Sequence, residues 1–532
     1  MWMGPSPPQQ TDMKVLIHEL RMHLMTSYRL KAAIIPAMAT LIFTGCRVGP
    51  AYHLPTATAQ APPATYQETP EQNPDTTGDW KIAQPQDAML RGKWWEIYNQ
   101  PELNDLEEKL NIDNQNIKEY FENFMEARTL IAQARAQLYP TLTTAPSYAR
   151  SRASANTGSS TGSTGSTGGS QTSLTSLPAT ASWEPDLWGK VRNAIREEQY
   201  NAQLSAADLE NERLIEQATL AEVFFEIRGQ DALVDLYKST VEEDRKAYEI
   251  AKSGHDTGVS DEITTVEAEN TLETAESALT NLGVARAQYE HAIAVLIGTN
   301  PSSFKIDPRA FTAAPPSIPI GLPSQLLERR PDIAAAERNM AAANAQIGVA
   351  VAAFYPNLTL SAEGGLESST LKHLFDWPSR FWSVGPSVSE TIFDAGLRRA
   401  SVNQYVATYN ADVASYRQTV LTAFQQVEDY LSEVRILSKQ LQQQQAAVES
   451  AKKYVALETG RYDTGIDPYV DLVTAQTTLL SGQQSLTSLQ IEQMTASVQL
   501  IEALGGGWDA SQLPTPQQVS KKIGKNEIAI EK

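Results

Sequence analysis

The chain has 532 residues, a formal net charge of −20 at pH 7 and a single cysteine. The excess of carboxylates argues against nucleic acid as a partner, because there is no surplus of cations to displace counterions from phosphates. The six histidines have no metal-ligand spacing, and one cysteine cannot form a disulfide framework. We therefore expect no cofactor, no metal site and no catalytic residue.

Residues 1–45 are predicted to be a lipoprotein signal peptide. Four basic residues precede the apolar run AAIIPAMATLIFTG, which ends at the only cysteine, Cys46. Such a segment is typical of a secretory signal and is too short for a stable membrane span. The stretch from Phe43 to Cys46 resembles a bacterial lipobox, so we expect Cys46 to be acylated and to attach the chain to outer-membrane lipid. The alternative is an incidental free thiol.

Two Asp-Thr-Gly triplets, at Asp256–Gly258 and Asp463–Gly465, raise the possibility of an aspartic protease, in which two such loops share a proton. The second triplet lies 207 residues after the first, and the same offset aligns two heptad series of apolar residues. Such series are typical of coiled coils. The triplets are therefore interpreted as turns of two repeated helical hairpins, with Asp256, Gly258, Asp463 and Gly465 at the hairpin tips. The aligned series are Leu220, Ile227, Val234, Val241 and Tyr248, and Val427, Val434, Leu441, Val448 and Val455.

The repeat predicts the domain organisation. After an extended Pro-rich segment over 46–88, the first repeat covers 89–300 with a hairpin turn near 254–260. A linker over 301–322 leads to the second repeat over 323–507, whose turn lies near 460–468. Residues 508–532 are expected to be a flexible tail.

Alternating apolar and polar residues predict two strands in each repeat, at about 141–153, 176–186, 357–367 and 381–393. They could form soluble hairpins. If they cross a membrane, four strands are too few for a closed barrel, and unpaired edges are not tolerated in lipid. Several copies would then have to share one barrel.

Three stretches resemble the TolC-type outer-membrane factors, in particular their NodT-like lipoprotein branch that serves multidrug efflux. They are GCRVGPAYHLP, WWEIYNQPELNDL and LPSQLLERRPDIAAAERNMAAANAQIGVAVAAFYPNLTL. The resemblance covers residues from Cys46 to about Trp508. It implies a mainly α-helical fold: a homotrimer with a long periplasmic coiled-coil barrel and a shared twelve-stranded transmembrane β-barrel.

The resemblance also implies partners and a gate. A periplasmic adaptor (membrane fusion) protein would dock at the hairpin tips, and an inner-membrane efflux transporter would supply the energy. Matched by position, Arg461 and Tyr462 correspond to residues that hold the periplasmic aperture shut by bonding to a neighbouring hairpin. Val470 corresponds to an apolar constriction residue. Thr474 stands where relatives often carry an aspartate, and Asp467 and Asp471 lie close by.

The residues leave a second function class open. A lipid-anchored periplasmic adaptor also has helical hairpins and a lipobox. Adaptors have one hairpin flanked by β-rich domains, whereas this sequence has two hairpins and duplicated strands. The sequence therefore favours a passive outer-membrane exit duct of a Gram-negative efflux system over an adaptor.

Overall fold

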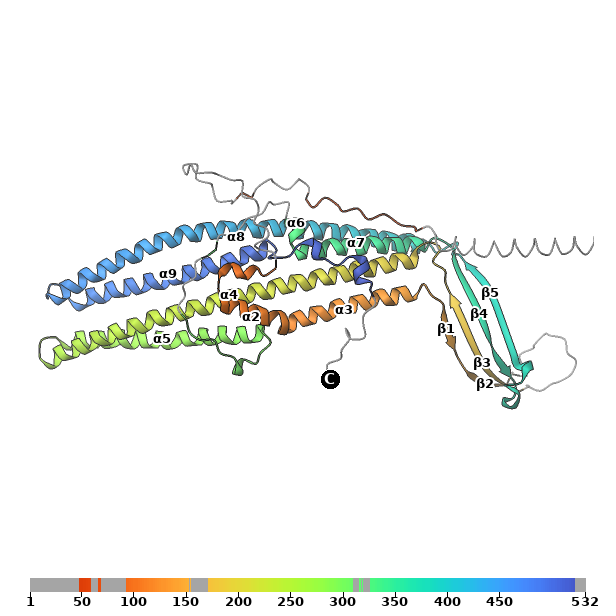
Figure 1. The fold of residues 1–532 in the computed structure, drawn as a ribbon, viewed down its shortest axis with the longest axis horizontal. Helices are drawn as coiled ribbons and strands as arrows, with labels where there is room; N and C mark the ends of the chain where they lie inside the picture. Colours follow the sequence, from red (N-terminus) through yellow and green to blue (C-terminus); the bar gives the residue numbers. More distant parts are fainter. Residues whose placement is uncertain are drawn as a thin grey trace, which may run out of the picture. The chain divides into compact units, whose positions relative to one another are not determined.

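The computed structural model of the chain describes residues 47–58, 66–67, 92–152, 154, 171–309, 315–316, 318 and 326–521. The predicted signal peptide, Cys46, part of the predicted linker and the last eleven residues lie outside the described residues. Long helices and one antiparallel sheet make up most of the described chain (Figure 1). The elements are η1 Trp94–Tyr98, α2 Pro101–Asp113, α3 Gln115–Ala136, β1 Thr141–Thr144, β2 Ser147–Arg152, β3 Gln171–Trp183, α4 Lys190–Asp256, α5 Glu262–Leu296, η2 Pro301–Ser303, α6 Leu326–Arg329, α7 Pro331–Ala352, β4 Asn357–Ser368, η4 Leu371–His373, η5 Trp377–Ser379, β5 Arg380–Ser389, α8 Leu397–Asp463, α9 Tyr469–Ala503, η6 Ala510–Gln512 and α10 Pro516–Val519.

Contacts divide the chain into two units. The first, called the sheet unit, holds all the strands together with the second half of α7 and the other helix ends that join them. The second, called the hairpin unit, holds α2, α5, α9 and most of α4 and α8. The sheet unit comprises the described residues of Met1–Tyr52, Leu130–Glu198 and Ala341–Tyr409, and the hairpin unit those of His53–Thr129, Gln199–Met340 and Asn410–Lys532.

The structure confirms the internal repeat predicted from the sequence. Helices α4 and α8 each have 67 residues, and α5 and α9 each have 35. The offset of 207 residues that aligns the Asp-Thr-Gly triplets also aligns both ends of each pair. Helices α3 and α7 are also equal, at 22 residues each. No proline interrupts α4 or α8, which is why helices this long can form.

The sheet has the order β1–β3–β4–β5, and β2 also pairs with β3. Every pairing is antiparallel. Strands β1 and β2 occupy the segment for which one strand was expected over 141–153. Pro146 separates them, because proline has no backbone N–H to donate to a neighbouring strand. Strand β5 ends at Ser389 and not near 393, because the chain then turns into α8, with Asp394 bonded to the amides of Gly396 and Arg398.

The register of the strands sorts apolar and polar residues onto opposite faces, since directly paired residues share a face. On one face, called the apolar face, Leu142, Ala181, Ala362 and Val384 form a row across the sheet. On the opposite face, called the polar face, Thr180 pairs with Glu363, and Glu363 with Ser383. The apolar face extends over eight residue steps from Leu358 to Leu366, or about 27 Å at 3.4 Å per residue.

The main core of the hairpin unit is built around fully buried aromatic residues. Trp94, Phe224 and Phe225 are each about 1% exposed and pack with aliphatic residues of α2, α5 and α9. Glu107 of α2 is completely buried, and neither of its carboxylate oxygens has a hydrogen-bond partner. Burial raises the pKa of Glu107 well above its ordinary value and so favours the neutral form of its side chain.

The expectation of a flexible tail from residue 508 does not hold for residues 508–521. Trp508 is 8% exposed and Val519 is 2% exposed. Two glutamines of α4 hold this segment: Gln203 Nε2 donates to the carbonyl of Pro514 at 2.7 Å, and Gln199 Nε2 to Ser520 Oγ at 2.9 Å. Separately, none of the helices in the described ranges combines the length and apolar character needed to cross a membrane.

Candidate functional site

Both Asp-Thr-Gly triplets end a long helix in the same way. Gly258 has φ +72° and Gly465 has φ +73°, the left-handed conformation that favours glycine. The amide of the next residue, Val259 or Ile466, donates to the carbonyl five residues earlier, at 2.8 and 2.9 Å. This is the Schellman arrangement of a helix C-terminus. The repeated triplet is therefore a helix-stop signal used once in each hairpin.

The carboxylates of the triplets do not form the paired site of a protease. Asp256 and Asp463 are both exposed, and each is the last residue of a 67-residue helix and not part of a loop between strands. The outermost apolar side chains at the tips are also exposed, Val259 by 84% and Ile466 by 67%. Each tip thus offers a small apolar surface next to a carboxylate, which suits contact with another protein.

At the second tip, Arg461 closes the turn by an ion pair with Asp467, called the tip ion pair. Arg461 donates to both carboxylate oxygens, with Nη2 at 2.8 Å from Oδ1. These hydrogen bonds hold the pKa of Asp467 below its ordinary value. Desolvation, together with a hydrogen bond to Asp467, raises the pKa of Glu458 on α8. One cation and two carboxylates therefore meet at this turn.

The first tip has no such ion pair. At the offset of 207 residues, Gly254 and Ser260 stand where the second tip has Arg461 and Asp467. The hydroxyl of Ser260 donates to the carbonyl of Ala251 at 3.1 Å. The two tips have the same backbone but different side-chain chemistry, and the arginine–aspartate pair is present only at the second.

Tyrosines pack the second hairpin against the first within one chain. Tyr469 is 6% exposed and belongs to a cluster with Leu472 of α9 and Ala251 and Ala268 of the first hairpin. Tyr462 packs against this cluster, and its ring centroid lies 5.5 Å from that of Tyr469. Burial, followed by the nearby charge of Asp244, raises the pKa of Tyr469 to about 12.

The remaining predicted aperture residues lie on α9 just after the turn. Val470 is 50% exposed, and Asp471 and Thr474 are also exposed. The hydroxyl of Thr474 donates to the carbonyl of Val470 at 2.8 Å. An open groove is lined by Thr474 and by the hydroxyl residues that follow it, Thr477, Thr478 and Ser481. The surface beyond the turn is thus a stripe of hydroxyls, with the carboxylate of Asp471 at its start.

The sequence reasoning missed three of the residues that shape this tip. Asp467 was noted only as a nearby carboxylate and not as the partner of Arg461. Glu458 and Tyr469 were not noted at all. Tyr469 could have been noticed because aromatic side chains contribute large buried areas to packing contacts.

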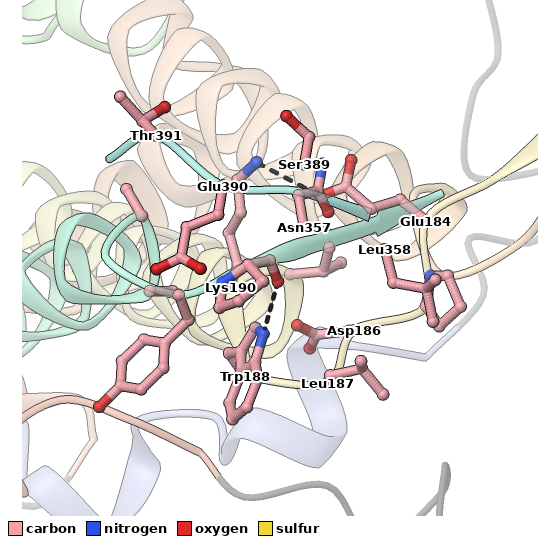
Figure 2. A pocket seen from close by; sticks show the side chains of 16 residues that line it. Glu184, Asp186, Leu187, Trp188, Lys190, Asn357, Leu358, Ser389, Glu390 and Thr391 are labelled. Atoms are coloured by element: carbon pink, nitrogen blue, oxygen red, sulfur yellow. Dashed lines mark hydrogen bonds and ion pairs between the residues drawn. The ribbon is translucent and has the colours of Figure 1, made fainter. Parts of the chain in front are cut away.

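At the helix end of the sheet, a small cavity lies where β3, β4 and β5 join their helices (Figure 2). Trp188 Nε1 donates to the carbonyl of Pro356 at 2.8 Å, and its ring stacks on that of Tyr355 with centroids 4.7 Å apart. Lys190 lies 3.7 Å from the carboxylate of Glu184. Of the three carboxylates that line the cavity, Glu184 is paired with Lys190 and Asp186 with Arg192. We call this region, where strands connect to helices, the joint.

The segment that follows Cys46 is bound at this joint. The amide of Val48 donates to the carbonyl of Trp188 at 3.1 Å, and the buried Asn193 donates from Nδ2 to the carbonyl of Val48 at 3.0 Å. Asn344 Nδ2 donates to the carbonyl of Pro50 at 3.3 Å. Within the part of the chain that the structure describes, no three His, Cys, Asp or Glu side chains are placed to hold a metal ion.

Comparison with known proteins places the chain in a family. The model of the outer membrane efflux protein family matches residues 108–299 and 322–506. The chain is 31% identical over 497 residues to the antibiotic efflux pump outer membrane protein ArpC of Pseudomonas putida, covering 93% of this chain and 99% of the relative. Among solved structures it is similar to the outer-membrane channel OprN, with a TM-score of 0.75 and 27% identity, over 87% of this chain and 100% of that one.

The open state of the Neisseria gonorrhoeae MtrE outer membrane channel is similar as well. Its TM-score is 0.73 at 25% identity, over 87% of this chain and 99% of that one. The matches extend through both repeats and include the strands and both hairpins, which favours a channel over the adaptor alternative. The chain belongs to the outer membrane efflux protein family, whose members are the outer-membrane components of efflux pumps.

Proposed function

We propose that three copies of this chain form one passive channel for small molecules, lipid-anchored through Cys46 and gated at the hairpin tips. A periplasmic adaptor protein contacts the tips, and an inner-membrane efflux transporter supplies substrate and energy. Family membership supports the outer-membrane efflux role. The trimer is supported by the edges of the sheet and the gate by contacts at the tips, whereas the anchor is supported by the lipobox-like sequence that ends at Cys46.

The main observation is an amphipathic sheet of four strand positions with two unpaired edges, in which β1 and β2 share one position. Strands β1 and β2 together form one edge by pairing only with β3, and β5 forms the other by pairing only with β4, within the described residues. Backbone groups at such edges cannot remain unpaired in lipid, and barrels begin at about eight strands. Three copies supply the twelve strands that the family resemblance implies and pair every edge.

The apolar face has the dimensions of a lipid-facing surface. Its length of about 27 Å is close to the roughly 25 Å outward band of outer-membrane barrels. Trp382 and Val384 on this face are 80% and 72% exposed in the single chain, far more than a soluble sheet leaves to water. The polar face, with Glu363 and its serine and threonine neighbours, would line the lumen.

At the hairpin tips, the tip ion pair would limit the aperture. Arg461 forms an ion pair with Asp467 across its own turn, and Tyr462 and Tyr469 pack the second hairpin against the first. An adaptor helix that binds beside Val259 and Ile466 could exchange these contacts for its own. Opening would then be a shift between two packed arrangements and would need no chemical energy in the channel itself.

The experiment is reconstitution of the purified mature protein in liposomes that contain a small fluorescent dye. We expect a cross-linkable trimer and dye release that is slow alone and faster with an Arg461→Ala variant. A monomer that sediments with the liposomes but releases no dye in either form would contradict the channel and point to an anchored adaptor.

A further inference from the structure

We propose that the loop end of the sheet binds phosphate groups of outer-leaflet glycolipid through Arg150, Arg152 and Arg380. This inference rests on the proposed function, because it takes the apolar face to be in contact with lipid. The loop end is the end opposite the helices, where β2 leads into β3 and β4 into β5 (Figure 1). If the helices extend into the periplasm, this end faces the outer leaflet.

The first observation is how the charged residues of the strands are sorted. The five strands contain five charged side chains: Arg150, Arg152, Arg380, Glu363 and Glu367. The register places all three arginines on the apolar face and both glutamates on the polar face. Arg380 pairs with Leu366 and Leu366 with Leu177, while Arg150 pairs with Ser173 and Arg152 with Gln171.

The second observation is where the arginines lie along the strands. Arg380 stands in the last row of the apolar band, and Arg150 and Arg152 lie beyond that band, past Tyr148. Arginine is costly at the middle of a bilayer and tolerated near the interface, where its guanidinium reaches the headgroups. A lipid-facing surface with arginine at one boundary only is therefore complementary to anionic headgroups on that side.

The third observation is that these cations have no carboxylate partner among the described residues. Arg150 donates only to the amide oxygen of Gln171, at 3.0 Å. The guanidinium of Arg380 lies over the ring of Trp377, 3.8 Å from its centroid, which leaves its N–H edges available. In the same loop, the carboxylate of Asp376 is within hydrogen-bond distance of Nδ1 of His373, at 2.7 Å.

At the helix end of the same sheet, cations are paired with carboxylates. There Lys190 pairs with Glu184, and Arg192 Nε lies 3.0 Å from Asp186. Arg398 likewise lies 2.6 Å from Asp394. These three cations at the helix end are paired with carboxylates within the protein, whereas the three arginines at the loop end are not. The chain as a whole has a net charge of −20. Unpaired arginines at the loop end therefore make this boundary of the apolar face suited to an anionic partner.

The loop between β4 and β5 adds apolar anchoring beside the arginines. Leu371, Phe375 and Trp377 are 68%, 74% and 75% exposed. Aromatic side chains next to cations are typical of a membrane interface, where the ring packs on the lipid and the charge meets the headgroup. Bidentate guanidinium–phosphate contacts would give the site its preference for phosphorylated glycolipid over zwitterionic lipid.

The test is native mass spectrometry of the purified protein in detergent. The probes are bis-phosphorylated lipid A, the same lipid A without phosphates, and inorganic phosphate. We expect the wild-type protein to prefer the phosphorylated lipid by about tenfold, and Arg150→Gln/Arg152→Gln/Arg380→Gln to lose that preference. Lys238→Gln/Lys246→Gln/Lys452→Gln removes the same charge from exposed helix positions and should keep the preference.

Arg150→Lys/Arg152→Lys/Arg380→Lys is the control for loss of folding. It retains the charge but not the bidentate geometry of arginine, so it should keep only part of the preference. Equal binding of both lipids by wild type, or an unchanged preference in the Gln variant, would overturn the inference. So would competition by inorganic phosphate at the concentration of the lipid. Dye release from the same preparations separates the two proposals: a wild type that conducts without lipid preference contradicts this inference alone, whereas one that does not insert contradicts the proposed channel as well.

Discussion

Arg461 and Asp467 form a bidentate ion pair across the turn of the second hairpin, six residues apart and within one chain. The family resemblance led us to expect that Arg461 bonds to a neighbouring hairpin. Within the single chain its partner is Asp467 of the same turn, and a bond to a neighbouring hairpin remains a prediction. A residue held in this way can pass between an internal partner and an external one, which is what a gate requires.

The first prediction concerns pH and the tip ion pair. The pKa of Asp467 is lowered below its ordinary 3.8, so the pair is present above that value and is lost only as pH falls through the lower folded pKa. The pKa of Glu458 is raised above 4.5, so Glu458 binds a proton first, while Asp467 remains charged. Resting conductance should therefore be constant between about pH 7.5 and 5.

Asp467→Asn is the matched variant, and its conductance should be high throughout this range. Arg245→Ala breaks an exposed ion pair with Glu276 in the first hairpin and should leave conductance low. A wild-type conductance that already rises between neutral pH and pH 5 would contradict the assignment of Asp467 as the partner that holds Arg461.

The second prediction concerns the tyrosine cluster at the tips. Tyr469→Ala removes a buried ring that joins the hairpins, so we expect faster amide exchange in both tips and a higher conductance. Tyr469→Phe keeps the ring and should behave as wild type. Tyr454→Ala, at a 40% exposed position on α8, is the control for loss of a tyrosine. If Tyr469→Phe were as open as Tyr469→Ala, the hydroxyl and not the packing would be responsible.

The third prediction concerns the glycine in each triplet. A Cβ at Gly465 would meet no atom within 4 Å, so the cost of Gly465→Ala is backbone strain alone, about 1 kcal/mol. Gly460 lies five residues earlier inside α8, also with free space, and Gly460→Ala should stabilise the helix by up to about 1 kcal/mol. The rate of hydrogen exchange at the tip amides should rise in Gly465→Ala and fall in Gly460→Ala. A change in the same direction for both variants would show that the left-handed conformation at Gly465 does not require glycine.

The fourth prediction concerns Glu107 and stability. Its raised pKa means that the folded protein binds a proton more tightly than the unfolded chain, so stability falls as pH rises above about 4.5. Glu107→Gln removes this titration and should raise the free energy of unfolding near pH 8 by about 1–3 kcal/mol. Glu122→Gln, on the exposed surface of α3, should change nothing. Thermal unfolding at several pH values checks this, and an unchanged midpoint for Glu107→Gln at pH 8 would contradict a neutral buried carboxyl.

Much of the fold follows from the sequence because it is repeated. The shared offset of 207 residues, the heptad series and the absence of proline together define α4, α8 and their returning partners. Alternation defines the strands because one face of the sheet is apolar. These are periodic patterns, and they predict a helix or a strand even when the elements that pack against it are unknown.

The rest depends on contacts between distant residues. The polar composition of residues 508–521 predicts a flexible segment, but hydrogen bonds from two glutamines of α4 attach it to that helix. Glu107 lies in a helix of ordinary amphipathic composition, and nothing local indicates complete burial. The choice of Asp467 over Asp463 or Asp471 as the partner of Arg461 depends on turn geometry. The sorting of arginines to one face becomes visible only when the strand register is known.

The most direct test of the account is the single-channel conductance of the mature protein in a planar bilayer, measured for wild type and Arg461→Ala. A low, flickering wild-type conductance that rises several-fold in the variant would support both a barrel shared between copies and a gate at the tips. The same stable, large conductance in both proteins would contradict the gate at Arg461, and no conductance from protein confirmed in the bilayer would contradict the channel.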